Sequence, residues 1–135
     1  MHVSSVKLVA LVAAAAAGVL VAPVAAQAPA LAMLDRLERG EWLVRFRGTG
    51  EQRRVCLRTG RELIQMRHGN GDCSRYVVED SAGQVTVQYS CAGNGYGRTS
   101  IRRESATLAQ VESQGIADGK PFQFTAEARR TGACR

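Results

Sequence analysis

Hydrophobic and polar residues alternate along most of this chain after Gly40. Val85, Val87 and Tyr89 alternate with polar neighbours over residues 84–91, and aromatic and alanine residues do the same over 122–129. A period of two is typical of strands with one buried and one solvated face. The same pattern predicts further strands over 41–47, 53–57, 74–79, 98–104 and 108–114.

Two short helices are predicted beside the strands. Leucine residues recur at helical spacing over 29–39, and Gly40 is placed to end that helix. A second helix is expected over 60–67, because Thr59 and Glu62 have the spacing of a capping box.

Together these elements predict an α+β fold that is mostly β. We expect an antiparallel meander of about seven strands that curls toward an open barrel, with one or two short helices. The chain has 135 residues, a length that holds one domain. The core is expected to form around five aromatic residues: Trp42, Phe46, Tyr89, Phe122 and Phe124.

Residues 1–26 have the pattern of a secretory signal peptide. An apolar run of 15 residues, 8–22, follows the cationic Lys7, and Val24-Ala25-Ala26 supplies small residues for cleavage before Gln27. A membrane anchor is the alternative, but the run is shorter than the ~20 residues that a spanning helix needs. We therefore expect export to the periplasm, no transmembrane segment after cleavage, and a single β-rich domain over 27–135.

Four cysteines lie in the predicted mature chain: Cys56, Cys73, Cys91 and Cys134. An even number in a small exported protein predicts two disulfides. A zinc site is the alternative, but such sites usually contain close pairs such as C-x-x-C, and none occurs here. Three pairings are possible. A hairpin of residues 74–79 and 84–91 brings Cys73 close to Cys91, which favours Cys73–Cys91 and Cys56–Cys134.

The basic residues are nearly all arginine, which makes up 16 of the 18 basic side chains against 12 acidic ones, for a net charge of +6. Loss of Lys7 with the signal peptide leaves 17 basic side chains and a net charge of +5. Arginine binds phosphates and carboxylates through two parallel hydrogen bonds. A predicted anion-binding set lies on the sheet face opposite the expected core: Arg45, Arg47, Arg75, Arg98 and Arg102. The alternative is an ordinary solvated surface, because acidic residues are interspersed among the arginines.

No set of catalytic residues is recognisable in the sequence. His68 is the one histidine after the signal peptide, and its glycine-rich surroundings predict an exposed loop residue rather than a general base. Glu79 and Asp80 could suggest the carboxylate pair of a glycosidase. They are adjacent, however, so their side chains diverge on a strand. The glycines of 93–97 lack the strand–helix context of a phosphate-binding loop and predict a hairpin turn. We expect no enzyme, no cofactor and no metal site, and export disfavours a nucleic-acid partner.

Short motifs in the chain resemble those of a family of small exported Gram-negative bacterial proteins. Gly40-Glu41-Trp42 resembles its Gly-x-Trp start, and Cys56-Leu57 before a Thr-led helix is similar to its Cys-Leu-Thr-Pro-Glu-Asp segment. Cys73 and Cys91 continue the match. The ending Arg130-Thr131-Gly132-Ala133-Cys134 resembles the family's Arg-x-Gly-x-Cys close.

That family is the domain of unknown function 3617 (DUF3617), and the resemblance covers nearly all of residues 40–134. This chain has Thr59-Gly60 where the family often has Thr-Pro, and Arg39-Gly40 where Pro-Gly is common. The resemblance implies a periplasmic β-rich domain and carries over no functional residue.

The leading hypothesis is a non-enzymatic domain that binds an envelope component, an anionic one. It rests on the predicted export, the two predicted disulfides, the arginine-rich outer face and the lack of a recognisable catalytic set. The alternative is a periplasmic inhibitor of a cell-wall hydrolase. It rests on Tyr89-Ser90-Cys91-Ala92-Gly93, which is similar to the Tyr-x-Cys-x-x-Gly segment of lysozyme inhibitors with the glycine one place early. The net charge argues against it, since such lysozymes are cationic too. The sequence leaves the ligand, the physiological role and the oligomeric state open.

Overall fold

Seven antiparallel strands form one sheet in the computed structural model, which describes residues 18, 21–22, 30–69 and 71–135. The predicted signal peptide, residues 1–26, lies outside the described residues apart from these three positions: Gly18, Val21 and Ala22.

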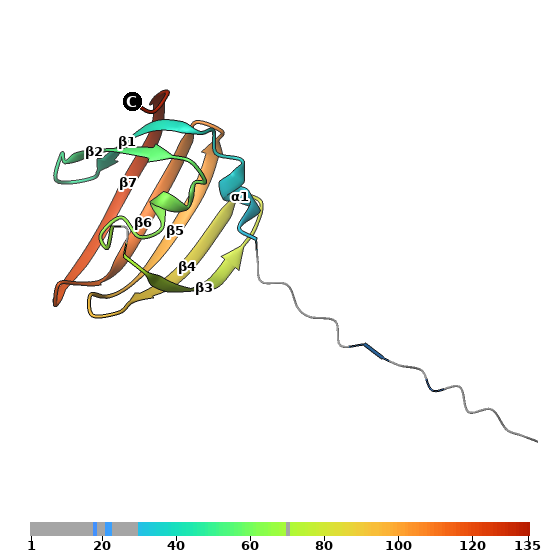
Figure 1. The fold of residues 1–135 in the computed structure, drawn as a ribbon. Helices are drawn as coiled ribbons and strands as arrows, with labels where there is room; N and C mark the ends of the chain where they lie inside the picture. Colours follow the sequence, from blue (N-terminus) through green and yellow to red (C-terminus); the bar gives the residue numbers. More distant parts are fainter. Residues whose placement is uncertain (1–17, 19–20, 23–29, 70) are drawn as a thin grey trace, which may run out of the picture.

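The elements follow one another as a hairpin, a long connection and a five-stranded meander (Figure 1). In chain order they are α1 (Ala32–Asp35), β1 (Gly40–Phe46), β2 (Gln52–Leu57), the 3-10 helix η1 (Arg61–Leu63), β3 (Cys73–Asp80), β4 (Gln84–Cys91), β5 (Gly95–Ser105), β6 (Leu108–Ala117) and β7 (Lys120–Gly132). The strand order is β2-β1-β7-β6-β5-β4-β3. The predicted mostly β fold of about seven strands is therefore confirmed, and the bent sheet stays open because β2 and β3 are edge strands.

One face of the sheet, the inner face, carries the core. Trp42 and Val44 of β1, Tyr89 of β4 and Val111 of β6 are almost fully buried there. The sheet alone cannot cover this face, so two segments do: residues 31–37 around α1, and residues 58–69 around η1, which we call the covering segment. Their buried side chains join the same hydrophobic cluster: Leu31, Met33, Leu34, Leu37, Leu63, Ile64 and Met66. The opposite side is the outer face.

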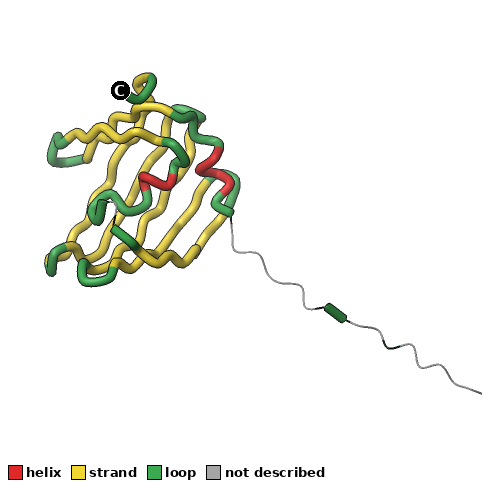
Figure 2. Tube along the Cα trace, in the orientation of Figure 1, coloured by secondary structure: helices red, strands yellow, loops and turns green. Residues whose placement is uncertain are grey.

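Both predicted helices are shorter than expected. The helix expected over 29–39 is α1, with four residues, because the backbone of Glu38 leaves the helix to donate to the carbonyl of Ala106. The helix expected over 60–67 contains only η1, and the rest of the covering segment is turns (Figure 2). Glu62 does accept hydrogen bonds from the backbone of Thr59, as a capping box requires. Packing against the sheet determines the path of both segments more than helix propensity does.

Both predicted disulfides are confirmed. Cys73 lies directly opposite Cys91 in the β3–β4 pair, so the hairpin register itself brings the two thiols together. Cys56, at the end of β2, is bonded to Cys134 after the end of β7. Cys56 and Cys73 also flank the covering segment, so each end of that segment is fixed to the sheet.

Removing the two disulfides separately should lower the free energy of unfolding by different amounts. The Cys56–Cys134 bond spans 78 residues and Cys73–Cys91 spans 18, so the chain-entropy model gives losses of about 4.5 and about 3 kcal/mol. Urea denaturation of Cys56→Ala/Cys134→Ala and Cys73→Ala/Cys91→Ala measures both. A larger loss from the second pair would contradict this prediction.

The glycines of 93–97 do not all belong to a turn, which corrects the sequence-based expectation. β5 begins at Gly95, and Gly97 lies on the inner face opposite Tyr89. A Cβ on Gly97 would lie 2.4 Å from the hydroxyl oxygen of Tyr89. Gly97 is therefore required by packing, because the tyrosine ring occupies the space above it.

Gly97→Ala should destabilise the protein by about 1–3 kcal/mol, the usual cost of forcing an extra methyl group into a filled core. Gly83→Ala is the matched control, since a Cβ there meets nothing within 4 Å. Thermal and urea denaturation of both variants test this prediction. Equal stability of the two variants would show that Tyr89 can move aside.

Candidate functional site

Four of the five arginines predicted to bind anions lie on the outer face: Arg45, Arg47, Arg98 and Arg102. Arg45 and Arg102 belong to one row across the sheet, because Arg102 is opposite Gln110, Gln110 is opposite Glu127, and Glu127 is opposite Arg45. Arg98 lies four residues before Arg102 on β5, about 13 Å away along the strand. The outer arginines are thus spread over the sheet.

Acidic and amide side chains separate these outer arginines. Arg102 forms an ion pair with Glu104, at 3.0 Å. Arg47, just after β1, donates to the amide oxygen of Gln110 at 2.8 Å. Glu112 and Glu127 also lie on this face. The outer face therefore has mixed charge. Exposed ion pairs of this kind contribute little to the stability of a protein.

Arg75 was expected on the outer face, and the structure places it on the inner one. It is directly opposite Tyr89, and residues opposite each other in an antiparallel pair share a face. Tyr76 consequently points outward and is 71% exposed. The physical reason is the Cys73–Cys91 bond, which fixes Cys73 to the inner face and so fixes Arg75, two residues on, to the same face.

Arg75 belongs to a groove that the sequence did not reveal, which we call the arginine groove. It has a volume of about 820 Å³ and runs between the edge strand β2, the outer side of the covering segment and the start of β3. Two carboxylates, Glu62 and Asp72, line it together with five arginines: Arg53, Arg54, Arg58, Arg61 and Arg75. The charged groups around this groove therefore sum to +3.

Four of the five groove arginines form hydrogen bonds or ion pairs within the protein: Arg53, Arg54, Arg61 and Arg75. Arg61 donates to Asp35 at 2.7 Å, and this hydrogen bond, together with the charge of Arg61, lowers the pKa of Asp35. Arg54 pairs with Glu41 at 3.3 Å. Arg53 donates to the carbonyl of Met66 at 2.9 Å.

Arg58 and Arg75 form no ion pair with any carboxylate among the described residues. Arg58 follows β2 directly and is exposed, whereas Arg75 comes from β3 on the other side of the groove. Arg75 donates to the amide oxygen of the buried Gln65, whose nitrogen donates to the carbonyls of Gly69 and Gly71. Gln65 therefore orients Arg75 and secures the end of the covering segment.

His68 is buried, so the prediction of an exposed loop histidine is wrong. Its Nε2 lies 2.9 Å from the carbonyl oxygen of Ile116 and its Nδ1 lies 3.0 Å from the hydroxyl of Tyr89. A carbonyl only accepts, so Nε2 donates and Nδ1 accepts from Tyr89 in the neutral ring. With both nitrogens engaged, His68 holds the covering segment on the sheet and is not placed as a general base.

The segment 89–93, which is similar to lysozyme inhibitors, has its tyrosine in the core and its cysteine in a disulfide. Tyr89 is 1% exposed, and Cys91 is bonded to Cys73. Ala92 and Gly93 are the exposed residues of its turn. The inhibitor hypothesis itself stays a prediction.

No family model matches the chain, and searches of curated proteins and of solved structures found no match either. The resemblance to DUF3617 therefore stays a prediction. In the part of the chain that the structure describes, no helix has the length and apolarity to cross a membrane. The same part contains no group of three or more histidine, cysteine or carboxylate side chains that could hold a metal ion.

Burial raises the pKa of the Tyr89 phenol above its ordinary value of 10.0, with the hydroxyls of Ser113 and Thr99 acting in the opposite direction. The unfolded chain therefore ionises first, and Tyr89 contributes stability that is complete below about pH 10 and is lost as the pH rises through the folded-state pKa. Tyr89→Phe should remove this part of the loss of folding stability at alkaline pH. Urea denaturation of both proteins from about pH 8 to about pH 11 tests it, and parallel curves would contradict it.

Proposed function

We propose that this protein is an exported, non-enzymatic binding domain that holds an anionic component of the cell envelope in the arginine groove. The observation that carries the proposal is the pairing of Arg58 and Arg75 from opposite sides of one groove, with no carboxylate partner among the described residues. The groove is large enough for a ligand, and its charge attracts anions.

The guanidinium group defines the chemistry of the ligand. It binds phosphate and carboxylate oxygens through two parallel hydrogen bonds, and it stays charged at every physiological pH. Gln65 holds Arg75 in position before any ligand arrives, which reduces the entropy lost on binding. Arg53, Arg54 and Arg61 add positive potential although each has an internal partner.

Export to the periplasm is part of the same proposal. The predicted signal peptide supports it, and two disulfides with no free cysteine fit an oxidising compartment. The resemblance to DUF3617 points to the same compartment. The envelope supplies anionic ligands of three sources: lipopolysaccharide phosphates, anionic phospholipids and peptidoglycan carboxylates.

Binding assays with the oxidised protein, purified from the periplasm, distinguish these sources. The probes are lipopolysaccharide, vesicles with and without anionic phospholipid, and peptidoglycan. We expect saturable binding to one of them that weakens as salt is raised. Arg58→Gln/Arg75→Gln should weaken it about 100-fold, because two hydrogen-bonded contacts to a charged group are lost.

Arg45→Gln/Arg102→Gln is the matched control, because it removes the same charge from the outer face. It should change the affinity by less than about twofold, since it removes only long-range attraction through screened solvent. If this control lost binding while the groove variant kept it, the ligand would belong to the outer face. That result, or no binding to any probe, would overturn the proposal.

A further inference from the structure

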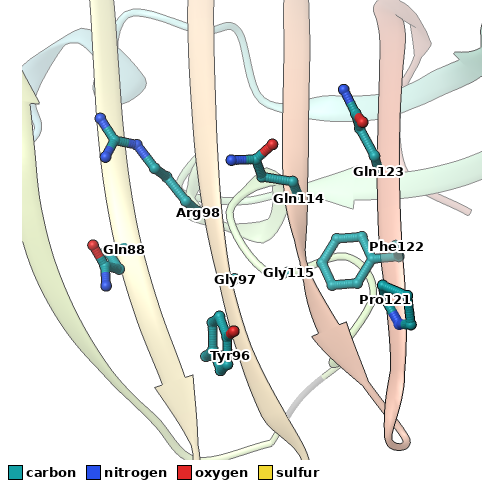
Figure 3. Close-up of a pocket in the computed structure, with 9 residues that line it drawn as sticks. All are labelled: Gln88, Tyr96, Gly97, Arg98, Gln114, Gly115, Pro121, Phe122 and Gln123. Carbon is teal, nitrogen blue, oxygen red and sulfur yellow. The ribbon is translucent and has the colours of Figure 1, made fainter.

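The outer face contains a second surface with a different chemistry. One row of directly opposed residues crosses five strands and spans about 19 Å. We call it the amide row, after its three glutamines, and its members are Tyr76, Gln88, Arg98, Gln114 and Gln123. All five side chains are exposed, and Figure 3 shows Arg98, Gln114 and Gln123 side by side on neighbouring strands.

The polar groups of the amide row have no side-chain partners among the residues that the structure describes. Neither Arg98 nor the three glutamines form a side-chain hydrogen bond or ion pair with any residue that the structure describes. Other rows of the outer face differ in this respect: Thr86 bonds to Ser100 at 2.8 Å, and Gln110 bonds to both Arg47 and Glu104. The donors and acceptors of the amide row are thus available to a ligand.

Two hollows give this surface a shape. One, of about 610 Å³, is lined by the row from Gln88 to Gln123 and by Tyr96, Pro121 and Phe122 (Figure 3). The other, of about 630 Å³, shares Gln88 and Tyr96 with the first and extends to Tyr76 and Arg75 at the edge strand β3. Tyr76 and Tyr96 are 71% and 53% exposed, so two aromatic rings flank a continuous polar track.

We infer that the amide row binds a mainly uncharged carbohydrate chain that bears a carboxylate opposite Arg98. Amide side chains both donate and accept, which matches sugar hydroxyl and acylamino groups. Tyrosine rings are amphipathic, and their faces suit the C–H faces of pyranose rings. Arg98 is the one charged side chain of the row, so charge complementarity calls for a mainly uncharged chain with a single carboxylate at that place. A protein partner fits less well, since interface cores are apolar.

Largely methyl-esterified oligogalacturonides that keep one free carboxylate (the acid form) and their fully esterified counterparts (the ester) are a matched pair of probes, because the last esterification removes the one remaining charge. Titration calorimetry should show that the oxidised protein binds the acid form about tenfold more tightly than the ester, the contribution of one charge-assisted contact. Arg98→Gln should abolish this preference without affecting ester binding. Tyr96→Ala should weaken both forms, and thermal denaturation should show all variants folded.

The single variant Arg58→Gln separates this inference from the proposed function, because Arg58 lines only the arginine groove, whereas Arg75 also lines the second hollow. It should bind oligogalacturonides as the unmodified protein does. If it lost this binding while Arg98→Gln kept it, the inference would be overturned and the proposed function would stand. Failure to bind either probe, or equal binding of acid and ester, would also overturn the inference.

Discussion

The structure depends on how one apolar sheet face is covered. A single sheet buries its inner face only if another part of the chain packs on it, and here the covering segment and the residues around α1 do so. The covering segment has little helix of its own to hold it together. Instead, Cys56 and Cys73 fix it at its two ends, and His68 bonds it to the sheet through Tyr89 and Ile116. Losing these attachments would expose the core.

The same attachments create the arginine groove. The covering segment buries Leu63 and Ile64 against the sheet, which leaves the polar residues of its outer side facing the edge strands. Arg58 lies just after β2, and Arg75 lies just after Cys73, so both disulfides determine how far apart the two sides of the groove are. Buried Gln65 takes part both in covering the core and in forming the groove, since it belongs to the covering segment and also orients Arg75. Stability and the proposed binding site therefore rest on the same residues.

Strict alternation made the strands and the hairpin disulfide predictable, because a period of two and a direct cross-strand pair depend on local sequence. Long-range packing could not be predicted in this way. The glycine-rich surroundings of His68 indicated an exposed loop, yet the ring is buried because it bonds to Tyr89 and Ile116, residues far away in sequence. Arg75 was predicted on the wrong face because alternation over residues 74–79 does not by itself say which side of the strand is buried. Cys73 and Arg75 are two residues apart, so they share one face of the strand. The predicted Cys73–Cys91 bond would therefore have placed Arg75 on the inner face.

The edge strand β3 connects the two proposed surfaces. Arg75 and Tyr76 are consecutive, so one points to the inner side and the groove while the other points to the outer side and the amide row. Arg75 also lines the second hollow of the amide row, so the two surfaces meet at this side chain. The charges differ as well, since the groove has five arginines and the row has one. If the ligands proposed for the two surfaces belong to one polymer, the second contact adds avidity without a new partner.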